Sequence, residues 1–256
     1  MKGPLIFALT IGISLSAFAQ SLDRVKLDSL FDILSSRNLA MGAISITQNG
    51  KPVYQRTVGK DQAPAATYRI GSITKVFTGI MIYELIDAKR LSLDDTLSEF
   101  FPDLPNSGQI TIAELLGHRS GLPNFTATAT NFDTWKEQPQ THEQLLGFIR
   151  NQHPNFAPGT KADYNNSNFL LLGYILEKIY HKPYKDIVKE RIIQRLHLHD
   201  TYYGDHAGFQ GSEVASYKYF DKPVAAGEGG ISRKFRRSRG NDLYAAGPLY
   251  IHHRYF

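Results

Sequence analysis

The stretch from Tyr68 to Gly79 reads "YRIGSITKVFTG" and places a hydroxyl and a charge in an otherwise apolar run. Gly71 interrupts the preceding segment, which predicts a helix that begins near Ser72. Lys75 lies three residues further on, and residues at this spacing share one face of a helix. The first turn of a helix also directs unpaired N–H groups at any negative charge that forms there. The stretch therefore indicates a serine that a lysine can activate.

The neighbours of Lys75 bear on whether it can act as a base. A lysine accepts a proton near neutral pH only where its surroundings disfavour the ammonium. Ile73, Val76 and Phe77 are apolar, and we expect them to surround the Lys75 side chain. The alternative is that Ser72 only caps a helix while Lys75 extends into water. The spacing by itself leaves both interpretations open.

A second motif follows in "FAPGTKADYNN", residues 156–166, where a Pro-Gly turn leads towards a helix. Tyr164 and Asn166 form the only Tyr-x-Asn in the chain. A tyrosine hydroxyl near Lys75 could share its proton, and the Asn166 amide could orient a substrate amide. The alternative makes Tyr164 a half-buried aromatic residue and Asn166 only a helix cap.

The rest of the chain predicts a mixture of strands and helices. Apolar spacing indicates an amphipathic helix over residues 22–37 and a further helix over 141–152. Alternating segments on both sides of Asn49-Gly50 predict a β-hairpin. The helix that follows Ser72 extends to about Lys89, and Asn166 or Ser167 caps another one. Strands followed by helices favour an α+β chain rather than repeated βαβ units.

Composition limits the classes of function. The chain has 256 residues, a net charge of +5 and no cysteine, which excludes disulfides, thiolate metal sites and a cysteine nucleophile. Residues 231–256 carry six basic residues and one acidic residue, which equals the whole net charge. We expect this segment to be a basic irregular tail rather than a nucleic-acid or lipid site, and the chain to have no nucleic-acid partner.

The first residues resemble a targeting signal. Lys2 precedes a short apolar run, and "AFA" ends at Ala19 before Gln20, as at a secretory cleavage site. The alternative is a membrane anchor, although the run is short for a span of about 20 residues. We expect a signal peptide over residues 1–19, no stable membrane insertion after cleavage, and a periplasmic or secreted protein.

Three longer stretches carry a resemblance to a known family. "YRIGSITKVFTGIMIYELIDAKRLSLDDTLSEFFPD", "ITIAELLGHRSGLPNF" and "FAPGTKADYNNSNFLLLGYILEKIYHKPYKDIVKERIIQRLHLHDTYY" resemble the serine β-lactamase and penicillin-binding-protein superfamily. The sequence is most similar to the branch of class C β-lactamases, D-alanyl-D-alanine carboxypeptidases and esterases, from about Leu22 to about Gly227. The resemblance implies an α+β fold, in which helices flank an antiparallel sheet and a mostly helical region is inserted.

The resemblance also implies roles for four residues. Ser72 would be the acylated nucleophile and its backbone N–H an oxyanion donor. Lys75 would accept the serine proton, Tyr164 would pass a proton to the leaving group, and Asn166 would hold the substrate amide. The implied substrate is a lactam, a D-amino-acid peptide of the cell wall or an ester, and no cofactor is implied.

Two histidine motifs invite other interpretations. "HRSGL", which begins at His118, matches a loop of the family that we expect to be structural, with His118 as a packing or hydrogen-bonding residue. "HLHD", residues 197–200, has two histidines, but a zinc site needs three or four converging ligands. We therefore expect no metal. A Ser-His-Asp triad is not indicated either, because the chain has no Gly-x-Ser-x-Gly.

The sequence departs from the family pattern near its C-terminus. The third family motif, Lys or His followed by Ser or Thr and then Gly, is absent, and "AAGEGGI" runs directly into residues 231–256. We expect the family's C-terminal strands, and with them half of the oxyanion hole, to be missing. Under this hypothesis residues 20–230 form an incomplete hydrolase domain and 231–256 a possible out-of-frame product. The alternative function is a binder of cell-wall peptides or an inactive relic.

Overall fold

A computed structural model describes residues 22–59, 66–128, 140–204 and 213–214, together with the backbone of three later strands. The chain forms two compact units, residues 1–60 and 61–256, and each is described by itself. The signal peptide expected at residues 1–19 lies outside the described residues. Within the described part, no helix is long and apolar enough to cross a bilayer.

The first unit is a helix followed by a β-hairpin. Helix α1 spans Arg24–Ser36, and strands β1 (Gly42–Gln48) and β2 (Lys51–Val58) pair antiparallel. The connecting residues Asn49 and Gly50 have φ angles of 52° and 72°. Positive φ at both central residues matches the twist of a two-residue hairpin, which explains the Asn-Gly pair. The predicted helix and hairpin are both confirmed.

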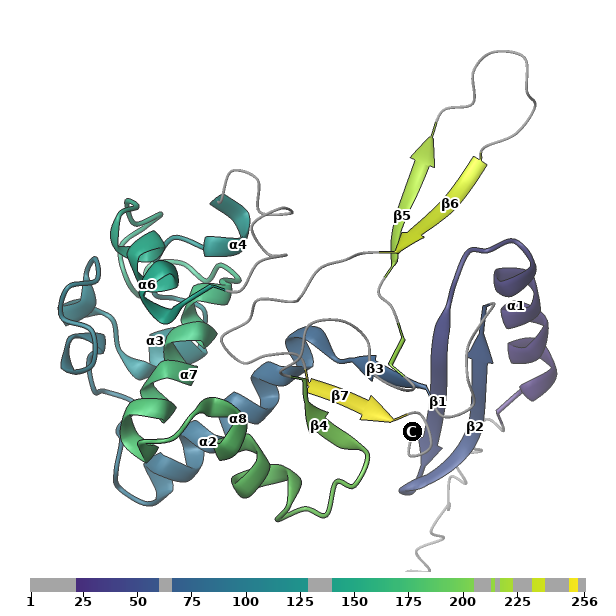
Figure 1. Cartoon of the computed structure of the whole chain (residues 1–256), viewed down its shortest axis with the longest axis horizontal. Helices are drawn as coiled ribbons and strands as arrows, with labels where there is room; N and C mark the ends of the chain where they lie inside the picture. Colours follow the sequence, from purple (N-terminus) through teal and green to yellow (C-terminus); the bar gives the residue numbers. More distant parts are fainter. Residues whose placement is uncertain are drawn as a thin grey trace, which may run out of the picture. The chain divides into compact units, whose positions relative to one another are not determined.

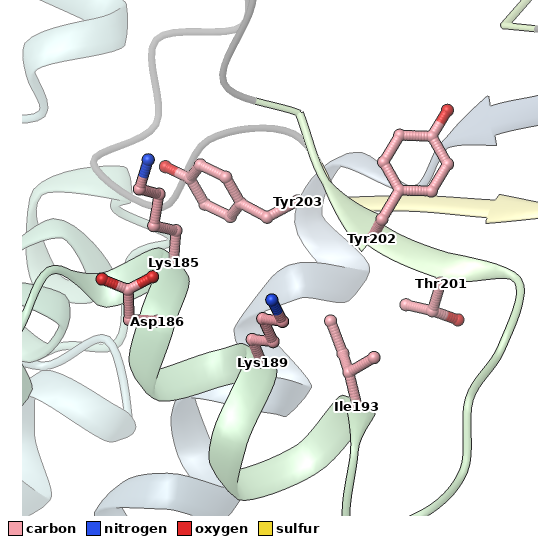
Figure 2. Close-up of a pocket in the computed structure, with 7 residues that line it drawn as sticks. All are labelled: Lys185, Asp186, Lys189, Ile193, Thr201, Tyr202 and Tyr203. Carbon is pink, nitrogen blue, oxygen red and sulfur yellow. The ribbon is translucent and has the colours of Figure 1, made fainter.

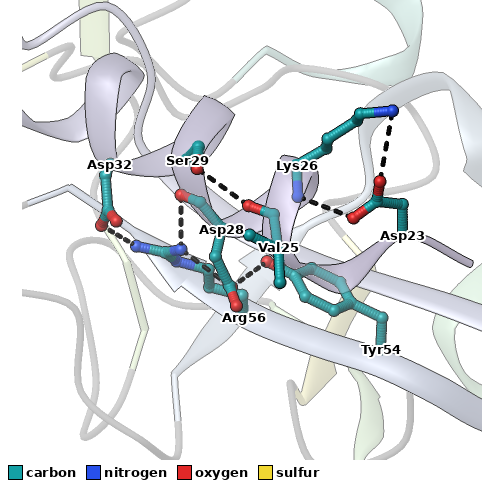
Figure 3. A network of polar contacts seen from close by, with 8 residues as sticks. All are labelled: Asp23, Val25, Lys26, Asp28, Ser29, Asp32, Tyr54 and Arg56. Carbon is teal, nitrogen blue, oxygen red and sulfur yellow. Dashed lines mark hydrogen bonds and ion pairs between the residues drawn. The ribbon is translucent and has the colours of Figure 1, made fainter.

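A polar network joins α1 to β2 (Figure 3). The Tyr54 hydroxyl donates to Oδ1 of Asp28 at 2.8 Å, and Nη1 of Arg56 donates to the same oxygen at 3.0 Å. Nη2 of Arg56 pairs with Asp32 one turn further along the helix. Asp23 caps the helix, because its carboxylate accepts from the Lys26 N–H at 3.0 Å. Bonds to two successive turns therefore hold α1 against the hairpin.

The second unit is mostly helical as far as residue 200 (Figure 1). Its helices are η1 (Gly71–Ile73), α2 (Thr74–Asp87), η2 (Leu97–Glu99), η3 (Ser107–Gln109), α3 (Ile112–Leu116), α4 (Phe125–Thr128), α6 (His142–Arg150), α7 (Asn166–Tyr180), α8 (Tyr184–Val188) and the π-helical η4 (Lys189–Ile193). The predicted helices after Ser72, over 141–152 and after Asn166 are confirmed within a few residues. The inserted helical region is therefore present.

Local sequence sets where several of these helices begin. Thr96, Thr111 and Thr141 each stand three residues before a Glu or Gln, and each pair forms a capping box. In this motif two otherwise unpaired N–H groups at the helix start are satisfied by side chains. Helix α7 is capped by Asn165, whose Oδ1 accepts from the Ser167 N–H at 2.8 Å. The predicted cap at Asn166 or Ser167 is wrong by one residue, and Asn166 is thereby left for other contacts.

Strands of the second unit form two small antiparallel sheets. Strand β7 (Leu249–His252) lies between β3 (Thr67–Arg69) and β4 (Thr201–Tyr203), and pairs antiparallel with both (Figure 1). Strands β5 (Tyr217–Lys222) and β6 (Ser232–Arg237) form a separate pair. The expectation of an irregular segment over 231–256 is therefore wrong at β6 and β7. Strand β7 pairs with backbone groups of β3 and β4 that would otherwise be exposed sheet edges, and β6 pairs with β5.

The core of the second unit lies between its helices. Buried apolar side chains come from Met81, Ile82, Leu85, Leu91, Leu97, Phe101, Leu104, Ile110, Ile112, Leu115, Leu122, Phe125, Leu145, Ile149, Leu170, Leu171, Leu172, Tyr174, Ile175, Leu176, Tyr184, Ile187, Val188 and Ile192. Helix α7 contributes most of its length and packs against α2, α3 and α8. Because α2 follows Ser72 and α7 begins at Asn166, this packing brings the two sequence motifs together.

Candidate active site

Ser72 lies in the short 3-10 turn η1, immediately before α2. The preceding Gly71 has a φ of 51°, a conformation in which a side chain is strained. A glycine at this position lets the chain leave β3 and turn directly into the helix. The Ser72 side chain is exposed, so a substrate can approach it from solvent.

The structure brings all four predicted site residues together. The Ser72 hydroxyl lies 2.6 Å from the Tyr164 hydroxyl, and Nζ of Lys75 donates to the same Oγ at 3.2 Å. Nζ of Lys75 also donates to Oδ1 of Asn166 at 2.8 Å. One serine oxygen therefore contacts both a phenol and an ammonium, on a site built from η1, α2, the irregular segment 151–165 and the start of α7.

The surroundings of Lys75 differ from the expectation. Ile73, the last residue of η1, and Val76, in α2, are 56% and 58% exposed. Two aromatic rings take their place: Nζ of Lys75 lies 5.0 Å from the ring centroid of Tyr164 and 5.7 Å from that of Phe169. A cation within about 6 Å of such ring faces is attracted to them. Aromatic rings rather than aliphatic side chains therefore lie beside Nζ of Lys75.

Asn166 is held from both ends of its amide. Its Oδ1 accepts from Lys75, and its Nδ2 donates to Oγ1 of Thr126 at 2.8 Å. The Asn166 N–H points to Oδ1 of Asn124 at 3.4 Å. Asn124 and Thr126 were not predicted, because nothing in their local spacing marks them. They follow directly after "HRSGLP", and only the folded chain places them beside α7.

The segment that carries Tyr164 is held by the loop 118–122. Main-chain groups pair across the two: the N–H groups of Asp163, Gly159 and Asn155 donate to the carbonyls of His118, Arg119 and Gly121 at 2.8, 2.9 and 2.8 Å. The Arg119 guanidinium donates to the Gly159 carbonyl in return. The loop predicted as structural therefore positions an irregular segment of the site.

The electrostatics of the site act on Tyr164. Partial burial raises the pKa of this phenol, but the hydrogen bonds with Lys75 and Ser72 and the charge of Lys75 outweigh that effect. The pKa of Tyr164 consequently lies below its ordinary value of 10.0. Tyr164 is 52% exposed, so solvent screens part of this effect. At moderate pH a larger fraction of Tyr164 is therefore in the phenolate form, which can accept a proton, than of a free tyrosine.

A pocket of about 330 Å³ lies elsewhere in the second unit (Figure 2). It is lined by Lys185, Asp186, Lys189, Ile193, Thr201, Tyr202 and Tyr203. None of the four predicted site residues lines it, and its charged side chains, Lys185, Asp186 and Lys189, are at least partly open to solvent. We place the candidate active site at Ser72, because the hydroxyl, phenol and amino groups converge there and none of them lines the pocket.

The second histidine motif lies on a turn. His197 has a φ of 53°, and its ring centroid lies 6.2 Å from that of His199, just before β4. Within the described ranges, no three His, Asp or Glu side chains converge in a way that could hold a metal ion.

Comparison with known proteins places this chain in a family. A family model described as beta-lactamase matches residues 27–246. The chain belongs to the beta-lactamase family. The match continues past Gly227, where the resemblance was expected to end, and includes strand β6.

Individual relatives agree with the fold. The chain is 28% identical to protein flp of Staphylococcus aureus over an alignment of 180 residues. This alignment covers 66% of this chain and 36% of flp. The chain is 26% identical over 188 residues to penicillin-binding protein 4* of Bacillus subtilis, covering 70% and 41%. A D-stereospecific amidohydrolase from Streptomyces sp. superposes with a TM-score of 0.71 at 24% identity, covering 87% and 68%. This chain therefore spans less than half of the length of flp and of penicillin-binding protein 4*.

Proposed function

We propose that this chain is a serine hydrolase that forms an acyl-enzyme on Ser72. One observation carries the proposal: Oγ of Ser72 lies within 2.6 Å of a phenol of lowered pKa and within 3.2 Å of an ammonium. A serine hydroxyl is a weak nucleophile unless an adjacent group removes its proton. The arrangement supplies such a group and a positive charge beside it.

In the proposed reaction, Oγ of Ser72 attacks the substrate carbonyl carbon while its proton passes to the Tyr164 oxygen. The C–N or C–O bond of the tetrahedral species then breaks, and Tyr164 returns the proton to the leaving nitrogen or oxygen. Water hydrolyses the resulting ester in the same way. Lys75 was expected to be the proton acceptor. We propose Tyr164 in this role instead, because its hydroxyl lies 2.6 Å from Oγ of Ser72, against 3.2 Å for Nζ of Lys75, and because its pKa is lowered. Lys75 then stabilises the phenolate.

The relatives support an amide of a D-amino acid or a β-lactam as the substrate. One similar protein is named a penicillin-binding protein and another a D-stereospecific amidohydrolase. An ester remains within the proposal, because acyl transfer to a serine proceeds through the same tetrahedral species. Asn166 lies beside the nucleophile and is the residue that we propose to orient the substrate amide.

Acylation should depend on pH through Tyr164. Because the pKa of this phenol is lowered, the phenolate that accepts the serine proton forms at a pH below 10.0. The rate of acylation is therefore expected to rise with pH, with its midpoint at the Tyr164 pKa and hence below pH 10.0. Measuring this rate with a chromogenic ester from pH 6 to pH 10 checks the prediction. A rate that rises with the same midpoint in Tyr164→Phe would contradict it.

A panel of substrates tests the function itself. The wild type is incubated with D- and L-phenylalanine amides, a chromogenic cephalosporin and a p-nitrophenyl ester, beside Ser72→Ala and the exposed control Ser36→Ala. Hydrolysis by wild type and Ser36→Ala, with none by Ser72→Ala, is expected. Saturable binding of a D-Ala-D-Ala peptide without any hydrolysis would instead establish a non-catalytic binder. Absence of both would overturn the proposal.

A further inference from the structure

Tyr164 lacks the support of regular secondary structure. It lies in the irregular segment 151–165, and its side chain is 52% exposed. Nevertheless its hydroxyl lies 2.6 Å from Oγ of Ser72, a distance that a free loop would not maintain. A misplacement of about 1 Å can lower a reaction rate by about 100-fold. Something outside the segment must therefore hold Tyr164 in place.

His118 contacts the chain on both sides of Tyr164 and the tyrosine itself. Its carbonyl accepts from the N–H of Asp163 at 2.8 Å, and its ring Nδ1 accepts from the N–H of Asn165 at 3.2 Å. Its ring centroid lies 4.7 Å from that of Tyr164. The other side of the histidine is supported by Phe169 on α7, at 5.2 Å between centroids. One residue thus holds the residue before, the residue after and the ring of Tyr164.

We propose that His118 is the positioning residue for Tyr164, and that it does this as a neutral imidazole with its proton on Nε2. This proposal rests on the proposed function for one point, that Tyr164 accepts the proton of Ser72. His118 itself touches neither Ser72 nor a substrate in this account. It acts through the hydrogen bond to Asn165 and the contact with the Tyr164 ring.

The neutral form is required by the direction of the hydrogen bond. Nδ1 can accept from the Asn165 N–H only while it carries a lone pair, and a protonated imidazole would place two N–H groups face to face. Desolvation lowers the pKa of His118, and the positive charge of Lys75 lowers it further. The net shift is downward from 6.5, which keeps the ring neutral at neutral pH.

The other charged and titratable groups near His118 have hydrogen-bond or ion-pair partners of their own. Asp163 pairs with Lys161 at 2.8 Å, and Arg119 donates to the Gly159 carbonyl. Tyr164 bonds with Ser72. As pH falls through the lowered pKa of His118, the ring gains a proton and the bond to Asn165 is lost. The sign is therefore fixed: Tyr164 is held above that pKa and released below it.

Two substitutions at His118 test the hydrogen-bond acceptor Nδ1 without changing the backbone conformation. His118 has a φ of 55°, which Asn and Gly both tolerate. His118→Asn keeps an acceptor oxygen close to the position of Nδ1, whereas His118→Gly removes the acceptor and the ring. His181 has a φ of 54° at the end of α7 and is exposed, so His181→Gly is the matched control.

The first measurement reads the position of Tyr164 without any reaction. Tyrosine labelled with ¹³C at Cζ is titrated by NMR, and the Tyr164 signal is assigned from Tyr164→Phe. In the wild type, His118→Asn and His181→Gly, the pKa of Tyr164 is expected below 10.0. In His118→Gly it is expected to return to its ordinary value, because the ring leaves Ser72 and Lys75. An unchanged pKa in a folded His118→Gly would overturn the proposal.

The second measurement is the rate of Ser72 acylation as a function of pH. His118→Gly is expected to react about 100-fold more slowly at pH 8, and His118→Asn within about tenfold of the wild type. Below pH 6.5 the wild type should also lose more rate than the protonation of Tyr164 accounts for, because His118 is protonated there, and His118→Asn should lack this additional loss. The same additional loss in His118→Asn would contradict the proposal. If no variant is acylated, the proposed function fails while the NMR result still decides the role of His118.

Discussion

Lys75→Met is expected to lower the rate of Ser72 acylation by about 1,000-fold. Methionine keeps the length of the side chain but removes the charge and the donors to Ser72 and Asn166. The pKa of Tyr164 would rise, because the charge and hydrogen bond of Lys75 hold it down. The serine would then lose both its activated acceptor and the cation that stabilises the phenolate. Stopped-flow measurement with a chromogenic ester gives the rate directly.

The matched control for this variant is Lys178→Met. Lys178 lies on α7 with its Nζ 4.7 Å from the ring centroid of Phe101, so it is also a cation over an aromatic ring, but away from Ser72. We expect this variant to react at the wild-type rate. A Lys75→Met protein that folds and reacts within about tenfold of the wild type would refute the role given to Lys75.

Gly121→Ala is expected to destabilise the protein by roughly 3 kcal/mol or more, through backbone strain and a steric clash. Gly121 has a φ of 71°, and a Cβ there would lie 2.0 Å from the carbonyl oxygen of Phe156. The carbonyl belongs to the backbone of the segment that carries Tyr164, so it cannot move away without moving that segment. The acylation rate of any folded variant should therefore fall by about 100-fold. Thermal unfolding and the rate of reaction measure the two effects.

Gly147→Ala is expected to change the stability in the opposite direction. Gly147 lies inside α6 with no atom within 4 Å of the added Cβ and no positive φ. Alanine is favoured over glycine in a helix by about 1 kcal/mol, so this variant should be more stable than the wild type and equally reactive. If Gly121→Ala were as stable as Gly147→Ala, the account of the loop 118–122 would be wrong.

The four site residues could be predicted from the sequence because short-range patterns carry them. Ser72 and Lys75 are one helical turn apart, and Tyr164 and Asn166 stand at a turn before a strongly apolar helix. Helix starts and apolar periodicity are local properties, so the elements around both motifs were predicted as well. The packing of α2 on α7 then places the two motifs together.

Other parts of the site depend on contacts that no local pattern records. Asn124 and Thr126 reach Asn166 from 40 or more residues away in the chain, and His118 reaches Asn165 from 47. The rings of Tyr164 and Phe169 replace the aliphatic neighbours that were expected around Lys75, because the direction of a side chain on α2 depends on which helix packs there. Strand β7 was missed for the same reason, since only its two partners define it.

The location of the covalent adduct tests the central claim most directly. The protein is incubated with a fluorophosphonate or a labelled penicillin and digested with trypsin, which cuts after Arg69 and Lys75 and releases residues 70–75. This peptide contains Ser72 and one other hydroxyl, that of the buried Thr74. We expect the added mass on Ser72 in the wild type and none in Ser72→Ala. An adduct on another residue, an equal adduct on Ser72→Ala, or none on the wild type at saturating reagent would contradict it.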